Sequence, residues 1–152
     1  MKTEPSHPLR FRKPERLRLR SLVEAVFREG DSLYAYPLRL SFLPQDAAEL
    51  DGRFRNGAPR GIDTLQVMVT VPKRKLRHAV DRVLMRRRIR EAYRLHRLAL
   101  KERLEADPQL RTLSMSIIYI ADRTLPYPKV EKALLTLLRK LGAALGPEAP
   151  DE

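Results

Sequence analysis

The stretch VPKRKLRHAVDRVLMRRRIREAYRLHR, residues 71–97, joins the end of an apolar strand to a strongly basic helix. Side chains three or four positions apart share one side of a helix. One side is then a row of arginines: Arg82, Arg86, Arg90, Arg94 and Arg97, with Arg87 beside it. The opposite arc carries side chains that we expect to pack on a sheet: Met85, Ile89, Ala92, Leu95 and Ala99. The pattern predicts a helix that packs on a sheet and points arginines outward.

Two charged residues of this helix, Asp81 and Arg88, fall toward its apolar side. We expect Arg88 to reach outward along its aliphatic stem, or both residues to meet a buried polar partner.

Strand and helix patterns surround the basic helix. Residues 65–71 (LQVMVTV) and 112–121 (TLSMSIIYIA) are apolar and rich in β-branched side chains, which predicts strands. The basic helix is expected over residues 79–106, because the residue before Pro108 disfavours the helical conformation. Residues 129–144 predict an amphipathic helix whose inner stripe is Val130, Leu134, Leu137, Leu138 and Leu141.

The N-terminal half predicts a helix over residues 15–29, with Pro14 in its first turn. Residues 33–43 are predicted to be extended, with Pro37 at an edge or a bend. Within them Leu38, Leu40 and Phe42 alternate with Arg39, Ser41 and Leu43, so one face should be more buried than the other.

Glycine and proline punctuate residues 44–63, which predicts a long mobile loop between two strands. We expect an α+β fold with one domain over residues 14–144. A flexible basic arm, 1–13, and a disordered tail, 145–152, are expected to flank it.

The positive charge of the chain is localised. Lysine and arginine number 31 against 19 acidic residues, for a formal net charge of +12. Residues 1–20 carry +5 and residues 73–97 carry +9, so the remainder nets −2. Unrelieved like charges destabilise a helix, so a polyanionic partner is favoured over a merely solvated face. Guanidinium groups suit this role because they grip phosphate oxygens through two hydrogen bonds.

Several classes of function are excluded or disfavoured. The chain has no cysteine, which removes disulfides, thiolate metal sites and cysteine nucleophiles. No apolar run approaches the roughly 20 residues of a membrane span, and no targeting segment is recognised, so a cytoplasmic location is expected. His7, His78 and His96 lack partners at metal-ligand spacing, so no catalytic residue and no metal site are predicted in the protein.

Four aromatic residues could stack on unpaired bases: Phe27, Tyr34, Tyr36 and Tyr93. Tyr93 lies in the pattern of the basic helix, so core packing is favoured for it. For Phe27 the sequence leaves both roles open.

Four pieces of the chain together resemble the bacterial ribonuclease P protein family. They are FRKPERL (11–17) with LVEAVFREG (22–30), VMVTVPKRK (67–75), HAVDRVLMRRRIREAYRL (78–95), and the trailing strand and short helix. The third piece is the most specific, since it is similar to the family's Arg-Asn-Arg helix. The pieces cover most of residues 11–141.

The resemblance implies an α–β sandwich with a left-handed βαβ crossover, as in the second domain of a small-subunit ribosomal protein. It implies that the protein binds the catalytic ribonuclease P RNA and the single-stranded 5′ leader of precursor tRNA. Cleavage would then depend on Mg²⁺ bound mainly by the RNA subunit. DNA and membranes are not expected partners.

The resemblance also implies which residues contact RNA. By position these are Arg16, Phe27, Arg82, Arg86, Arg87 and Arg90. The neighbouring basic residues Lys73, Arg74, Lys75 and Arg94 complete the expected set. Val83, Leu84 and Val23 replace an asparagine, an arginine and an aromatic of the family, so leader binding there should be weaker or carried elsewhere.

Two other functions fit the composition. A non-enzymatic RNA-binding module, such as a ribosome-associated protein, matches the charge and the helix pattern equally well. A nuclease that needs no RNA would have to cleave as pure protein. A membrane-surface helix is disfavoured because the apolar side of the basic helix lacks Trp and Phe.

Overall fold

The protein folds around a four-stranded mixed sheet in the computed structural model, which describes residues 11–146. The strands are β1 (Asp31–Ala35), β2 (Leu38–Gln45), β3 (Leu65–Thr70) and β4 (Thr112–Tyr119), in the spatial order β1-β2-β4-β3. β2 pairs antiparallel with β1 and β4, whereas β3 and β4 are parallel. This arrangement confirms the predicted α+β class.

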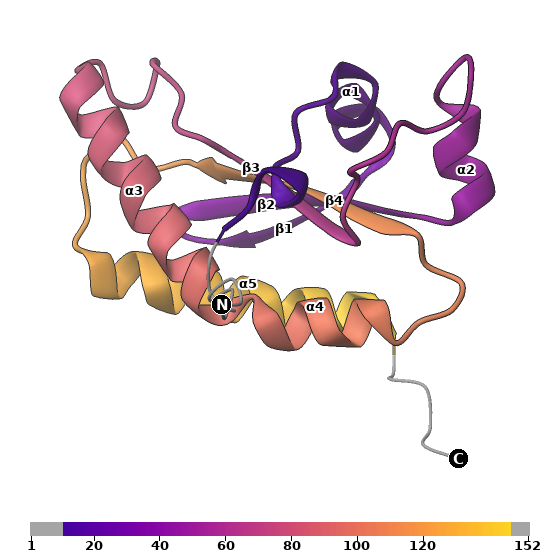
Figure 1. Ribbon diagram of the computed structural model, residues 1–152. Coiled ribbons are helices and arrows are strands. Elements are labelled where there is room, and N and C mark those ends of the chain that lie inside the picture. The colour runs from indigo at the N-terminus through magenta and orange to yellow at the C-terminus, as the bar shows by residue number, and fades with distance from the viewer. Residues whose placement is uncertain (1–10, 147–152) are drawn as a thin grey trace, which may run out of the picture.

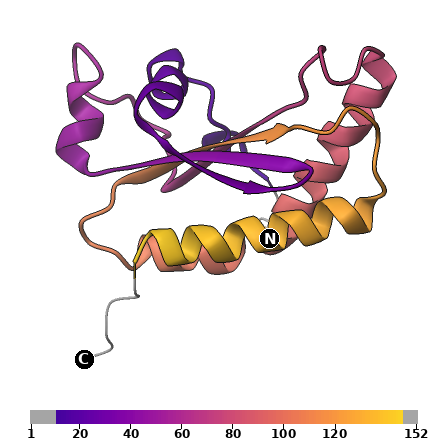
Figure 2. The ribbon, with the colours of Figure 1, turned by 180° about the vertical axis from the view of Figure 1, so that it is seen from behind.

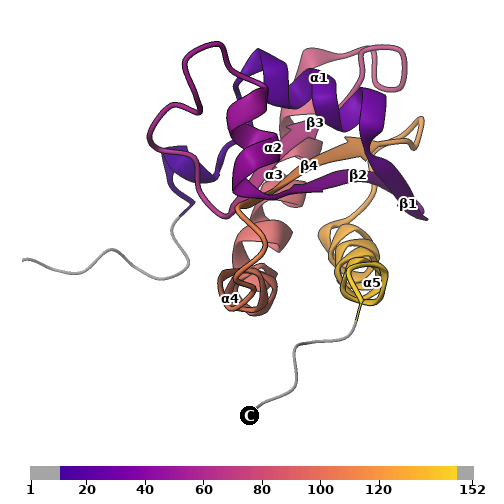
Figure 3. The same cartoon turned by 90° about the vertical axis from the view of Figure 1, so that its right-hand side faces the viewer.

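Helices cover both faces of the sheet. They are η1 (Lys13–Glu15), α1 (Arg20–Glu29), α2 (Ala47–Gly52), α3 (Ala79–His96), α4 (Leu98–Glu105) and α5 (Tyr127–Ala144). Figure 3 shows α1 and α2 on one side and α4 and α5 on the other. Seen from behind, α5 runs beneath the hairpin of β1 and β2 (Figure 2). The parallel strands β3 and β4 are joined through α3 and α4.

Two hydrophobic clusters hold the layers together. On the α5 side, Leu38, Leu40 and Phe42 of β2 join a core that includes α3, α4, α5 and the inward side chains of β4. On the other side, a smaller cluster joins α1, α2 and the adjoining segments: Leu17, Leu22, Val26, Leu50 and Ile62. Burial of each such side chain contributes about 1.5–3 kcal/mol. The alternation predicted for β2 is therefore confirmed.

The N-terminal helix begins later than predicted. Residues 15–29 were expected to be helical, but α1 starts at Arg20. Before it, the Leu17 N–H donates to the Val67 carbonyl at 2.8 Å, and Arg16 forms a parallel bridge with Val67. Pairing with β3, an edge strand, replaces the helical hydrogen bonds that the local sequence would otherwise make.

Residues 33–43 are two strands rather than one. β1 and β2 form a hairpin whose turn is Tyr36 and Pro37, so the bend predicted at Pro37 is confirmed. The prediction of a single extended segment was wrong. The chain reverses in only two residues, and no run of polar residues marks that turn in the sequence.

The region 44–63 contains a helix that was not predicted. Asp46 caps α2: its carboxylate accepts from the Glu49 N–H at 2.8 Å, and Glu49 accepts from the Asp46 N–H at 3.1 Å. Arg53 follows α2 and donates to both carboxylate oxygens of Glu29, at 2.8 and 2.9 Å. These hydrogen bonds from Arg53, followed by one from Arg28, hold the pKa of Glu29 down to about 2. α2 is thus fixed to the end of α1.

The predicted helix over 79–106 is divided at Arg97. α3 and α4 run in different directions (Figure 1), and Leu95 and Ala99 are exposed near the junction, contrary to the prediction. Arg97 itself turns inward and is 1% exposed. α4 ends at Glu105, before Pro108, as predicted.

Arg97 meets Glu15, which is equally buried. Its Nε donates to Glu15 Oε1 at 2.7 Å, and the Arg12 N–H donates to Oε2 of the same carboxylate at 2.9 Å. Lys101 lies 3.8 Å from Glu15 and 3.0 Å from Asp63. Burial by itself would raise the pKa of Glu15, but these hydrogen bonds and positive charges bring it below its ordinary value.

The two ends of the chain fall mostly outside the described residues. The predicted arm is described only from Phe11, whose ring packs edge-on against Tyr93 at 5.8 Å. The predicted tail is described only to Gly146, and Leu145 packs against the larger core.

Glu15→Gln should lower the free energy of unfolding by about 3–5 kcal/mol, because it removes the buried carboxylate that pairs with the Arg97 charge. Urea denaturation at pH 7 measures the loss. Since the pKa of Glu15 is lowered in the folded protein, the pair stabilises above pH 4.5 and that stability is lost as the pH falls below it. The difference in the free energy of unfolding between the wild type and Glu15→Gln should therefore become smaller as the pH falls below 4.5.

The control is Glu24→Gln, which removes an exposed pair with Arg20 and should cost about 0–1 kcal/mol. Equal effects of the two substitutions would contradict a special role for Glu15.

Candidate nucleic-acid interface

Three arginines form the exposed charged surface of α3. We call Arg86, Arg87 and Arg90 the arginine ridge. Arg87 and Arg90 are exposed and Arg86 is half-buried. Among residues 11–146, none of the three side chains has a hydrogen bond or an ion pair, so their donors are available to a ligand. This part of the predicted row has the orientation that a polyanion requires.

Arg82, predicted in the same row, instead holds the segment before α3. Its Nη1 donates to the carbonyls of Leu76 and Arg77, at 2.9 and 2.8 Å. Leu76 is buried and closes a turn on Pro72. The turn carries the predicted basic residues Lys73 and Arg74, which are exposed, and Lys75, which is half-buried. Arg82 thereby places a second group of cations at the start of the helix.

The far end of the predicted row is different. Arg94 forms two hydrogen bonds with Glu91, at 2.8 and 3.1 Å. The bond lowers the pKa of Glu91 and raises the pKa of Arg94, so this charge is locally balanced. The prediction that Arg97 lies in the outward row is wrong, because Arg97 is buried against Glu15. The outward row is therefore shorter than periodicity indicated.

The segment before α1 adds cations beside the ridge. Phe11, Arg12, Lys13, Arg16 and Arg18 line a hollow of about 590 Å³. The Arg16 guanidinium lies over the Phe11 ring at 5.7 Å. Arg16 and Arg86 lie near Arg90: burial lowers the pKa of Arg90, and these two neighbouring charges lower it further. Arg12, Lys13 and Arg18 were not among the predicted contacts, although the charge of residues 1–20 pointed to them.

The sheet face toward α1 has two parts. One part is covered and its buried side chains are polar, and the part near the turn of β1 and β2 is accessible to solvent. Under the segments packed on this face the buried side chains are all polar: Ser41, Gln45, Gln66, Thr112, Ser114 and Ser116. Toward the hairpin turn, Tyr34 pairs across the strands with Arg39, and Arg39 pairs with Ile118. Tyr34 is 56% exposed and Arg39 is half-buried. This end of the face is accessible.

Aromatic and basic groups meet at that open end. The Arg39 guanidinium lies over the Tyr34 ring at 5.7 Å, and its buried Nε has no hydrogen-bond partner among the described residues. Phe27 on α1 is 51% exposed, so it is not a core residue. Arg39 was not predicted as a contact, but the alternation of residues 38–43 had placed it opposite the buried leucines.

The remaining predictions for α3 concern its inner side. Arg88 donates to the Leu125 carbonyl at 2.5 Å, which confirms the expected polar partner. Tyr93 is buried, as favoured, and burial raises the pKa of its hydroxyl. Val83 and Leu84 are 41% and 36% exposed, so they present apolar surface at the start of α3.

Within residues 11–146 no three histidine or acidic side chains gather as a metal site would require. In the same range no helix is long and apolar enough to cross a membrane. His96 lies 2.9 Å from Glu131, which also accepts from Tyr127 at 3.1 Å.

The fold and this surface define an α+β protein with an exposed basic helix beside a polar, aromatic-edged sheet, the combination expected of a nucleic-acid-binding protein. The sequence profile described as "Ribonuclease P" matches residues 11–142. The chain therefore belongs to the ribonuclease P protein family, and its role is that of a ribonuclease P protein subunit, whose partner is ribonuclease P RNA.

Individual relatives agree. The "Ribonuclease P protein component" of Porphyromonas gingivalis is 30% identical over 122 residues, covering 80% of this chain and 79% of the relative. The ribonuclease P protein of Staphylococcus aureus has a similar fold, with a TM-score of 0.56, 14% identity, and coverage of 84% and 94% of the two chains. The ribonuclease P protein of Thermotoga maritima also has a similar fold, with a TM-score of 0.54 and 22% identity. The match covers 83% of this chain and 96% of the Thermotoga chain.

Arg90→Gln and Arg94→Gln should change stability in opposite directions. The first removes a charge that is repelled by Arg16 and Arg86, and should raise the free energy of unfolding by about 0.2–0.5 kcal/mol. The second removes the pair with Glu91 and should lower the free energy of unfolding. Denaturation at low salt measures both, and 1 M salt should erase the difference. Shifts of the same sign would show that Arg90 is not electrostatically strained.

Proposed function

We propose that this subunit binds ribonuclease P RNA through the arginine ridge and binds the 5′ leader of precursor tRNA on the open sheet face, and so assists 5′ maturation of tRNA. The observation that carries the proposal is the arginine ridge, whose cations have no ion pair in the part of the chain that the structure describes. Arg16 continues it on one side and the turn of residues 73–75 on the other.

The ridge suits a folded RNA. Helical spacing places guanidinium groups about one turn, 5.4 Å, apart along α3, and each can hold a phosphate through two hydrogen bonds. Bound phosphates would also relieve the repulsion among Arg16, Arg86 and Arg90. Lys73 and Arg74, fixed in place by Arg82, extend the same basic surface.

The open sheet face suits a single strand. Tyr34 and Phe27 expose rings on which unpaired bases can stack, and Arg39 lies beside Tyr34 to meet the backbone phosphate. Half-buried Val23 stands one helical turn before Phe27, so α1 offers one aromatic ring rather than two. Stacking of this kind is tolerant of sequence, as leaders of different tRNAs require.

The protein contributes binding rather than bond cleavage in this proposal. The chemistry belongs to Mg²⁺ held mainly by the RNA subunit, and the protein screens phosphate repulsion and fixes the leader. The enzyme would act in the cytoplasm. The protein without RNA should leave precursor tRNA intact.

Reconstitution with ribonuclease P RNA tests the proposal. At low Mg²⁺ the wild-type chain should raise the rate of precursor-tRNA cleavage. Arg86→Ala with Arg90→Ala should weaken binding to the RNA and flatten its salt dependence by about 0.7–0.9 in log–log slope for each lost phosphate contact. Arg55→Ala with Arg60→Ala, two exposed arginines outside this surface, is the control of equal charge. No gain in cleavage from the wild type would instead favour an RNA-binding module with no part in the reaction.

Replacing the exposed rings should separate leader binding from RNA-subunit binding. Phe27→Leu with Tyr34→Leu should weaken holoenzyme affinity for precursor tRNA by about 1–3 kcal/mol per stacked base. Affinity for mature tRNA, which has no leader, should stay unchanged, as should assembly with ribonuclease P RNA. Equal losses for precursor and mature tRNA would remove the sheet face from the leader site.

A further inference from the structure

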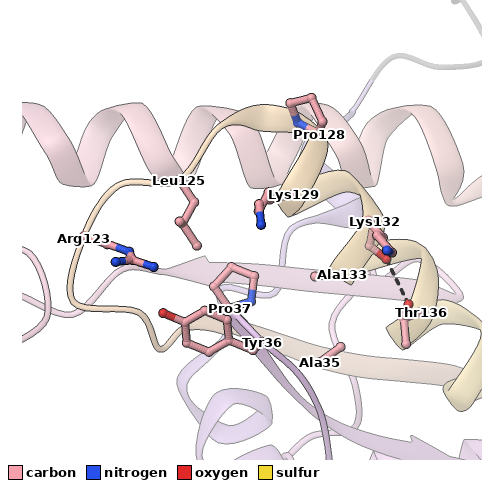
Figure 4. A pocket seen from close by; sticks show the side chains of 10 residues that line it. All are labelled: Ala35, Tyr36, Pro37, Arg123, Leu125, Pro128, Lys129, Lys132, Ala133 and Thr136. Carbon is pink, nitrogen blue, oxygen red and sulfur yellow. Dashed lines mark hydrogen bonds between the residues drawn. The ribbon is translucent and has the colours of Figure 1, made fainter.

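A second basic pocket lies between the hairpin turn of β1 and β2 and the first half of α5. Its volume is about 490 Å³, within the range of about 300–1,000 Å³ typical of ligand pockets. Pro37, Leu125 and Ala133 are buried and give it apolar walls. Figure 4 shows Arg123 and Tyr36 at one end, Lys132 at the other and Lys129 between them.

The charged residues of this pocket are all cations. Arg123, Lys129 and Lys132 line it, and no acidic residue among positions 11–146 does. All three are exposed, and their side chains have no hydrogen bond or ion pair within residues 11–146. The nearest acid on α5, Glu131, is engaged by His96 and Tyr127. Three cations around one hollow repel one another, and an anion held among them would offset that repulsion.

The pocket also offers an aromatic ring. Tyr36 sits in the two-residue turn and is 62% exposed, more than Phe27 or Tyr34. Its backbone neighbours are held by the hairpin, and Pro37 beside it is buried. An exposed ring next to cations matches a ligand that joins a flat base to a phosphate.

The pocket lies on a different side of α3 from most of the arginine ridge. Arg88 points to the pocket side of α3, since it donates to the carbonyl of Leu125. Arg86 and Arg90 are each two residues from Arg88, about 200° around the helix, and Arg87 is one residue away, about 100°. The pocket is therefore a site separate from Arg86 and Arg90.

We propose that the pocket formed by Tyr36, Arg123, Lys129 and Lys132 is an additional RNA site that takes one unpaired nucleotide, with its base on Tyr36 and its phosphate among the three cations. The proposal rests on the proposed function in one respect: it takes RNA to be the polyanion that this subunit meets. It gives the subunit an RNA contact separate from the arginine ridge.

Direct binding tests the pocket with the full chain. A four-nucleotide oligouridylate is titrated while the amide signals of Ala35, Leu125 and Ala133 are followed by NMR. These signals should shift with the oligonucleotide. Lys129→Gln with Lys132→Gln should abolish those shifts, and Tyr36→Leu should weaken binding about fivefold or more. Both lysines are exposed on α5, so their replacement should leave the fold intact. Unmoved pocket signals would overturn the proposal.

The source of the nucleotide is then found in the reconstituted system. Affinity of each variant is measured for ribonuclease P RNA alone and, in the holoenzyme, for precursor and mature tRNA. The lysine pair should lower affinity in one of these arms at least fivefold more than Arg55→Gln with Arg60→Gln, the control that also removes two positive charges. If only the affinity for ribonuclease P RNA falls, the pocket binds the RNA subunit. If only the affinity of the holoenzyme for tRNA falls, the pocket binds the tRNA.

The result is independent of the leader and ridge assignments. If the wild-type chain failed to stimulate cleavage, the proposed function would be contradicted. The NMR titration would still test whether the pocket binds the oligonucleotide. If stimulation were normal and the lysine pair matched its control in every arm, the pocket alone would be refuted. Pocket shifts produced by a hexaglutamate peptide but not by the oligonucleotide would point to an acidic protein partner and also refute the RNA site.

Discussion

The buried ion pair between Glu15 and Arg97 is the constraint on which the basic surface depends. Two charges are removed from water at a cost that only good geometry and further hydrogen bonds offset; Arg97 and the Arg12 N–H supply those bonds to Glu15. The pair fixes the segment before α1 to the junction of α3 and α4, and Arg16 comes to lie near Arg90. The buried pair of opposite charges thus holds Arg16 and Arg90 near each other despite their mutual repulsion.

The arginines of α3 and of its C-cap, Arg97, have three different roles. Arg82 and Arg88 donate to backbone carbonyls, Arg97 pairs with a buried carboxylate, and Arg94 pairs with Glu91. Only the arginine ridge stays unpaired among the described residues. Periodicity predicted the amphipathic helix and its basic side correctly. It could not distinguish these roles, because the partners of Arg82 and Arg88 are backbone atoms and that of Arg97 lies 82 positions away.

The fold was predictable wherever local pattern and tertiary environment agree. β3, β4 and α5 follow from their apolar periodicity and appear close to their expected bounds. The start of α1 was not predictable, because the Leu17 N–H bonds to β3, far along the chain. α2 was predictable and was missed: Asp46 and Glu49 are the two ends of a capping box, a sequence signal outweighed by the surrounding glycines. The open sheet face could not be predicted from the sequence, because it depends on which strands pair with one another.

The bridge between Arg16 and Val67 has a consequence for solubility. A bare outer strand exposes unpaired peptide groups on which another polypeptide can add, which leads to aggregation. β3 is an outer strand, and the segment around Arg16 occupies part of its free rim with a strand-like contact. At the other rim, Lys140 donates to the Tyr34 carbonyl of β1 at 2.7 Å. Both edges of the sheet are thus partly occupied, that of β3 by the backbone of the segment before α1 and that of β1 by a lysine side chain.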